Sequence, residues 1–80
     1  MSVRIVFLGP LRDLAGTAEM AVDGPLDWQA LLAVVPPAVA QQLRLERVNV
    51  ACAGRVLAEK TALAAREGDE VALLPPVSGG

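Results

Sequence analysis

The chain has 80 residues, the size of one small domain, and its seven basic and nine acidic side chains give a net charge of −2. It contains no histidine and a single cysteine. Without histidine it can form neither a Ser-His-Asp triad, nor a Cys-His pair, nor an imidazole metal site. One cysteine excludes an internal disulfide, a CxxC redox pair and a structural zinc cluster. We therefore expect no catalytic side chains that act alone and no bound metal.

The charge and hydropathy patterns argue against several kinds of partner. Basic residues are spread singly from Arg4 to Arg66, so the chain offers no basic patch for nucleic acid. The longest uncharged stretch, residues 28–43, is shorter than a bilayer span and is broken by prolines and glutamines. The apolar run 5–8 meets a Gly-Pro pair and charges too soon to be the h-region of a signal peptide. These patterns predict a cytoplasmic protein that binds neither nucleic acid nor membranes.

The first third of the chain predicts an antiparallel hairpin. Residues Val3–Leu8 are rich in β-branched and aromatic side chains, and a Gly-Pro pair ends this strand. A loop follows, from which Leu11 and Leu14 should turn back toward the core. Residues 17–22 then form a second strand, and the short connection favours antiparallel pairing with the first.

The middle of the chain predicts helix. Asp27 can accept hydrogen bonds from the free amides at a helix start, and apolar residues recur every three or four positions over Trp28–Val35. The Pro36-Pro37 pair ends this helix. Pro37 can also begin a second short helix that continues to Leu43.

The remaining residues predict three strands and a tail. Residues 46–52 alternate between apolar and polar, 55–57 return after a Gly turn, and 58–66 are irregular. Glu70–Leu74 forms the last strand, which the following prolines end. One main helix across a mixed sheet of about five strands is an α+β domain, and a helical crossover favours parallel pairing of the third or last strand with the first. This order predicts a β-grasp fold over residues 1–74, followed by a flexible, extended tail over 75–80.

Several segments resemble a known family. Residues 53–59, with Leu63 downstream and Gly-Gly at the end, are similar to the corresponding part of ubiquitin. A more specific resemblance is to the small, sulfur-carrying subunit of molybdopterin synthase. Its residues are Phe7 with 11–17, Val48-Asn49, 67–71 and the ending PPVSGG of residues 75–80. The likeness covers nearly the whole chain and is weakest between Asp23 and Glu46.

The resemblance implies a sulfur carrier without a permanently bound cofactor. In that family an E1-like enzyme adenylates the terminal carboxylate, here that of Gly80, with ATP. Sulfur from a sulfurtransferase or desulfurase then converts it to a thiocarboxylate. The small subunit inserts its tail into the large catalytic subunit, in a heterotetramer of two small and two large subunits. There, two such sulfurs convert the cyclic pyranopterin monophosphate precursor to molybdopterin.

The tail residues suit this chemistry. A free carboxylate has no usable leaving group, so it must be activated by partner enzymes, and no side chain of this protein has to take part. Glycine at positions 79 and 80 lets bare backbone enter a narrow channel. Six residues reach at most about 20 Å when extended. Insertion into the partner is expected for Pro75, Pro76, Val77, Ser78 and Gly79.

A candidate partner surface lies beside the tail. The predicted core residues of the first and last strands are Val3, Ile5, Phe7, Val71 and Leu73. On the opposite face the same strands place Val6, Leu8, Ala72 and Leu74, and a cluster of exposed apolar side chains usually marks a partner site. A helix or loop that covers part of them is the alternative.

Other functions and ordinary roles remain open. A thiocarboxylate carrier on the same fold can serve thiamine thiazole, cysteine or tRNA thiolation, and a ubiquitin-like modifier uses the same ending to attach to lysines. A plain interaction domain is a further alternative. Among the remaining residues, Cys52 is expected to be a buried, inert thiol. Lys60, the only lysine, is expected to be a solvated loop charge, and Trp28 to be a packing residue.

Overall fold

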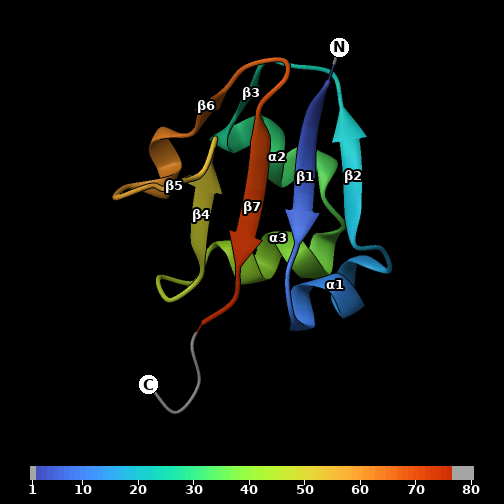
Figure 1. Cartoon of the computed structure of the whole chain (residues 1–80). Coiled ribbons are helices and arrows are strands. Elements are labelled where there is room, and N and C mark those ends of the chain that lie inside the picture. Colours follow the sequence, from blue (N-terminus) through green and yellow to red (C-terminus); the bar gives the residue numbers. More distant parts are fainter. Residues whose placement is uncertain (1, 77–80) are drawn as a thin grey trace.

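The computed structural model describes residues 2–76, which form a mixed sheet with helices packed on one of its faces (Figure 1). The sheet order is β2-β1-β7-β4-β5, and a separate two-stranded sheet pairs β3 with β6. The strands are β1 (Val3–Phe7), β2 (Glu19–Val22), β3 (Leu26–Asp27), β4 (Asn49–Cys52), β5 (Arg55–Val56), β6 (Ala64–Ala65) and β7 (Glu70–Leu74). The helices are α1 (Pro10–Ala15), α2 (Trp28–Val34), α3 (Pro37–Leu43) and the 3₁₀ turn η1 (Lys60–Ala62).

The pairing of the strands confirms the predicted α+β topology. β1 runs antiparallel to β2 and parallel to β7, with Ile5 opposite Val71. The last strand is therefore the parallel partner of the first, and β4 pairs with it from the other side. Two neighbours on each side make β7 the central strand. Because β7 is central, it ends in the middle of the row of strand ends, and the chain continues from there to Pro75.

Burial follows the alternation of the strands. The inward side chains of β1 and β7, with Val50 of β4, are buried together with residues of the helices, whereas their neighbours along the strands are more exposed. This core includes Val3, Ile5, Phe7, Val50, Val71 and Leu73 from the sheet and Leu31, Val39 and Leu43 from the helices. The predicted core positions of β1 and β7 are confirmed.

The helices follow the predicted boundaries closely. The Asp27 carboxylate accepts a hydrogen bond from the Ala30 amide at 2.8 Å, which confirms it as the N-cap of α2. α2 ends one residue earlier than predicted, and the second short helix is present as α3 with Pro37 in its first turn. Neither is long, and no helix of residues 2–76 is long and apolar enough to cross a membrane.

The segment after β1 differs from the prediction because it forms a helix, α1, rather than a loop. Pro10 supplies a fixed φ at its start and Gly16, at φ 76°, ends it in the left-handed region. Leu11 is buried and Ala15, four positions later, packs against the core. Leu14 lies beside this pair and is 44% exposed, so the expectation that it turns inward is wrong.

The stretch expected to be irregular, residues 58–66, contains η1 and β6. β6 pairs with β3, where Leu26 lies opposite Ala65. Each strand has only two residues, too few for alternation to be visible in the sequence. β7 ends at Leu74, and the division into a domain over 1–74 and a tail over 75–80 stays a prediction.

Candidate functional site: the tail base and an apolar sheet face

The tail begins at the end of β7, where it is held on two sides. Leu74 pairs with Asn49 of β4, and Pro75 is half-buried. A Cβ added to Gly9 would lie 3.2 Å from Cγ of Pro75, so the bare backbone of Gly9 forms one wall of the tail base. Gly9 also has a φ of 55°, which side chains rarely adopt. Pro76 is exposed and ends the described residues.

The rest of the predicted tail, Val77, Ser78, Gly79 and Gly80, lies outside the described residues. Its insertion into a partner and the chemistry of Gly80 therefore stay predictions.

The predicted partner residues alternate with the buried residues along β1 and β7, so they face the side of the sheet that carries no helix (Figure 1). Val6 lies directly opposite Ala72 across β1 and β7. Leu8 is 38% exposed just beyond the end of β1, while Val6, Ala72 and Leu74 are each half-buried. The described helices are on the other face of the sheet, so they do not cover this cluster.

Sequence reasoning missed two members of this cluster. Ala51 of β4 lies opposite Ala72, and Val56 of β5 lies opposite Ala51. Val56 is 60% exposed, more than any other large apolar side chain among the described residues. We call this surface the apolar sheet face; its residues are Val6, Leu8, Ala51, Val56, Ala72 and Leu74.

The alternation of residues 46–52 already placed Ala51 outward, and only the pairing of β5 with β4 could bring Val56 beside it.

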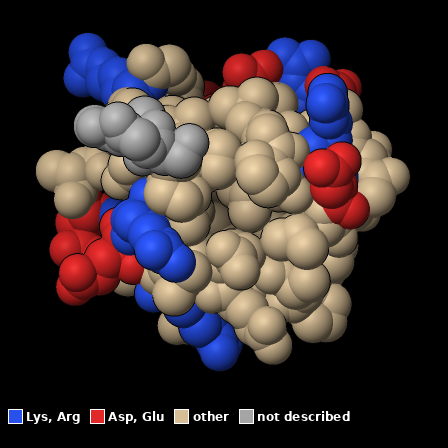
Figure 2. Space-filling view, turned by 90° about the horizontal axis from the view of Figure 1, so that it is seen from below, with Lys and Arg blue, Asp and Glu red and all other residues tan. Residues whose placement is uncertain are grey.

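Charges border the apolar sheet face. Two residues farther from the tail than Val6 and Ala72, Arg4 lies opposite Glu70 and the two form an ion pair. Both side chains are about half-exposed, so we expect this pair to contribute little to stability. Seen from the tail end, charged side chains lie near the margins and leave a broad uncharged area between them (Figure 2). The apolar sheet face, with the Arg4–Glu70 pair at its border, offers an apolar contact surface beside the tail base.

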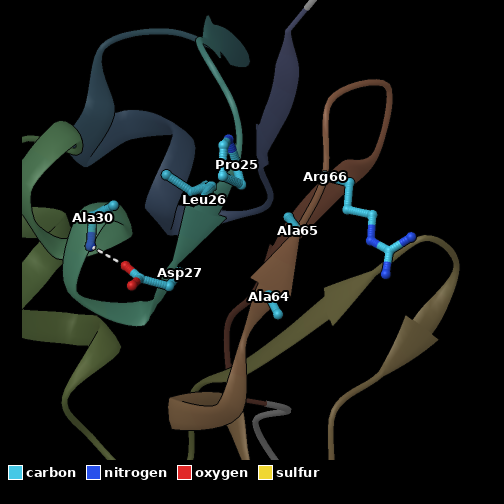
Figure 3. A pocket seen from close by; sticks show the side chains of 7 residues that line it. All are labelled: Pro25, Leu26, Asp27, Ala30, Ala64, Ala65 and Arg66. Atoms are coloured by element: carbon cyan, nitrogen blue, oxygen red, sulfur yellow. Dashed lines mark hydrogen bonds between the residues drawn. The ribbon is translucent and has the colours of Figure 1, made fainter.

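A hollow in the described part of the chain lies elsewhere. It has a volume of about 340 Å³ and lies between α2 and the small β3-β6 sheet, at the opposite end from the tail (Figures 1 and 3). Its lining is mostly apolar: the Asp27 carboxylate is engaged by the Ala30 amide, and Arg66 points away from the other lining residues (Figure 3). It therefore lacks the converging polar groups that an active site needs.

Two ionisable side chains that the sequence singled out, Cys52 and Lys60, make contacts within the fold. Cys52 is only partly buried, with its Sγ 4.0 Å from an oxygen of Asp69. Burial, and secondly the negative charge of Asp69, raise the pKa of this thiol, so a reactive thiolate is disfavoured. Lys60 is not a solvated loop charge, because its ammonium binds backbone carbonyls. Within residues 2–76 no three His, Cys, Asp or Glu side chains come together as metal ligands.

A mixed sheet that is crossed on one face by helices, with its last strand at the centre, defines the ubiquitin-like β-grasp fold. The sequence places the chain more narrowly. Residues 5–80 match the model of the ThiS family, and the chain belongs to this family of ubiquitin-like sulfur carriers. No curated protein matches the sequence significantly.

Solved structures agree with this assignment. SAMP1 from Haloferax volcanii is 32% identical over 100% of both chains, with a TM-score of 0.68. The HVO 2177 protein of the same organism is 27% identical over 100% of this chain and 87% of its own, with a TM-score of 0.73. In fold alone, the chain also resembles a structure from Helicobacter pylori 26695, the complex of subunits 1 and 2 of molybdopterin-converting factor. That likeness covers 100% of both chains at 24% identity and a TM-score of 0.65.

Proposed function

We propose that this protein is the sulfur carrier of molybdenum cofactor biosynthesis and acts as the small subunit of molybdopterin synthase. The observation that carries the proposal is the junction of β7 and the tail. In this ThiS-family fold the central strand β7 ends at Leu74, directly before the PPVSGG sequence, and Pro75 lies against Gly9 beside an exposed apolar face. In this role the protein presents its own C-terminus as the substrate of partner enzymes, and none of its side chains has to take part.

The proposed reaction takes place at the Gly80 carboxylate. An E1-like enzyme lets this carboxylate attack the α-phosphate of ATP, and pyrophosphate leaves. A persulfide sulfur from a sulfurtransferase or desulfurase then displaces AMP, and cleavage of the S–S bond by a thiol leaves the thiocarboxylate. The sulfur passes to the cyclic pyranopterin monophosphate precursor in the large subunit. All acid–base groups for these steps come from the partners.

The apolar sheet face is proposed to bind these partners. Val56 and Leu8 lie at opposite sides of the face and are its most exposed large side chains. Burying them against a partner would place binding energy next to the point where the tail enters the active site. The H. pylori structure, which holds subunits 1 and 2 of molybdopterin-converting factor together, supports a large-subunit partner for this fold. The stoichiometry of two small and two large subunits is part of the proposal.

Intact-mass measurement tests the chemistry. The protein is incubated with the activating enzyme, ATP and a sulfur donor from its own organism, and we expect the mass gain of one oxygen-to-sulfur exchange. This gain should disappear when the large subunit and the pterin precursor are added. A chain lacking Gly79 and Gly80 is the control and should show no gain. Retention of the sulfur in the presence of the molybdopterin system would contradict the proposed pathway and favour thiamine thiazole, cysteine or tRNA thiolation.

A matched pair of variants tests the apolar sheet face. Val56→Ser removes an exposed valine from the face, whereas Val34→Ser removes a 37% exposed valine from α2, on the helical side of the sheet. We expect only Val56→Ser to weaken binding to the large subunit, by about tenfold, the effect of losing roughly 1.4 kcal/mol of contact energy. Equal affinities for the two variants would exclude the face as the docking surface.

A ubiquitin-like modifier is the second candidate function. The 32% identity to SAMP1 over the whole chain favours it, since SAMP1 is described as a small archaeal modifier protein. In this role the activated Gly80 would form an amide with lysines of other proteins. Isolation of such conjugates from cells, dependent on Gly79 and Gly80, would establish the modifier function. Their absence, together with thiocarboxylate formation, would leave the carrier function.

A further inference from the structure

Lys60 is the only lysine of the chain; its side chain is half-buried, and its ammonium contacts three other groups. Nζ donates one hydrogen bond to the carbonyl of Leu45 and another, of 2.7 Å, to the carbonyl of Val48. The same atom lies 5.9 Å from the centre of the Trp28 ring, within the range of a cation–π contact. A lysine ammonium has three N–H donors, so two carbonyls and one aromatic face account for its bonding capacity.

These contacts join three segments that are separate in sequence. Lys60 begins η1, Trp28 begins α2, and the two carbonyls belong to the connection between α3 and β4. That connection leads directly to Asn49, which pairs with Leu74 at the tail base. Lys60 thus holds the loop that leads into β4, and the start of β4 pairs with the end of β7, where the tail begins.

We propose that Lys60 is a structural clamp withheld from acyl transfer, so that the activated C-terminus meets no free ε-amine in its own chain. The consequence for the C-terminus rests on the proposed adenylation of Gly80; the clamp itself does not. In the withheld reaction, the lone pair of a neutral amine attacks the acyl carbon of the adenylate. A C–N bond forms, the C–O bond to AMP breaks, and the amine releases a proton to solvent.

Two properties of the site affect this attack in opposite directions. Burial lowers the pKa of Lys60, and this effect exceeds the opposite influence of Glu46 and Glu59, so deprotonation is easier than for a free lysine. However, the two carbonyls and the Trp28 ring lie around Nζ, so an incoming acyl group must compete with these contacts for the amine. Attack therefore requires the clamp to open first.

Acetylation with the N-hydroxysuccinimide ester of acetic acid tests the clamp on the purified, folded protein. Arg55→Lys places a reference amine at an exposed position of β5 in the same molecule. Peptide mapping by mass spectrometry then compares the two amines over time. We expect Lys60 to react at least about tenfold more slowly than the reference amine, because it must wait for local opening. In urea the two rates should become equal.

Equal rates in the folded protein would overturn the proposal. Trp28→Leu provides a second measurement, because it removes the aromatic face and leaves both carbonyls; acetylation of Lys60 should become faster while the reference amine is unaffected. An unchanged rate at Lys60 would remove Trp28 from the clamp. Neither measurement uses the activating enzyme, so a failure of the proposed function would not be mistaken for a failure of the clamp.

A separate arm tests the consequence for the C-terminus. With the activating enzyme and ATP, wild-type protein should form no chains linked from Gly80 to Lys60. Linkage to the amine introduced by Arg55→Lys would show that acyl transfer is possible when an amine is accessible. Linkage at Lys60 of the wild-type protein would refute the withheld role.

Discussion

Substitution of Gly9 by alanine should both destabilise the fold and displace the base of the tail. Gly9 has φ 55° and ψ −134°, a conformation that is strained for any residue with a Cβ and costs about 1–3 kcal/mol. The added methyl would also lie 3.2 Å from Cγ of Pro75, so Pro75 must move by a few tenths of an ångström. A domain of this size is expected to have a total stability of only about 4–12 kcal/mol.

Gly16→Ala is the matched control. Gly16 also has a positive φ, 76°, but a Cβ added there meets nothing within 4 Å. This variant should lose about 1 kcal/mol from backbone strain alone, and hence about 4–8 °C in Tm for a domain of this length. Gly9→Ala should lose at least as much.

Thermal denaturation, together with NMR chemical shifts of residues 74–76, separates the two effects. Both variants should melt at lower temperature, and only Gly9→Ala should shift the signals of Pro75 and its neighbours. If Gly9→Ala leaves the Tm and these signals unchanged, the bare backbone at position 9 is not a wall of the tail base. Equal shifts at Pro75 in both variants would also refute the local contact.

Two further predictions concern stability. Asp27→Ala removes the side-chain acceptor at the start of α2 and should lower the free energy of unfolding by about 1 kcal/mol in urea titrations; Asp23→Ala, at an exposed position of the preceding turn, should change it far less. Because burial and Asp69 raise the pKa of Cys52, the unfolded chain loses the thiol proton first as pH rises. The contribution of Cys52 to stability is therefore complete below the unfolded pKa of about 9.0 and is lost as the pH rises through the higher folded value. Cys52→Ala should lack this decline when unfolding is compared at neutral and alkaline pH; an identical decline in both proteins would show that other groups cause it.

Local patterns were enough to predict most regular elements of the fold. β1 could be recognised from its β-branched and aromatic residues and β7 from an apolar run that two prolines end, and the parallel pairing was favoured by the helical crossover between them. Asp27 could be recognised as a cap because its carboxylate needs only the amides of its own helix. The same reasoning misread residues 11–16, although Pro10 and Gly16 are start and stop signals for a helix. A six-residue helix has too few apolar positions for its period to show.

The composition of the sequence by itself predicted a protein with no histidine-based or paired-cysteine chemistry. Its motifs indicated a ubiquitin-like sulfur carrier, the class that the ThiS-family match over residues 5–80 confirms. Only the tertiary structure decided whether the predicted partner residues form an exposed surface, because their exposure depends on which face of the sheet the helices cover. These residues are Val6, Leu8, Ala72 and Leu74. Strand pairing added Ala51 and Val56 to that surface from outside β1 and β7. Folding also converted Lys60 from an apparent loop charge into a clamp, because its carbonyl and aromatic partners lie 12 to 32 positions away in sequence and meet only when η1 packs beside α2 and the start of β4.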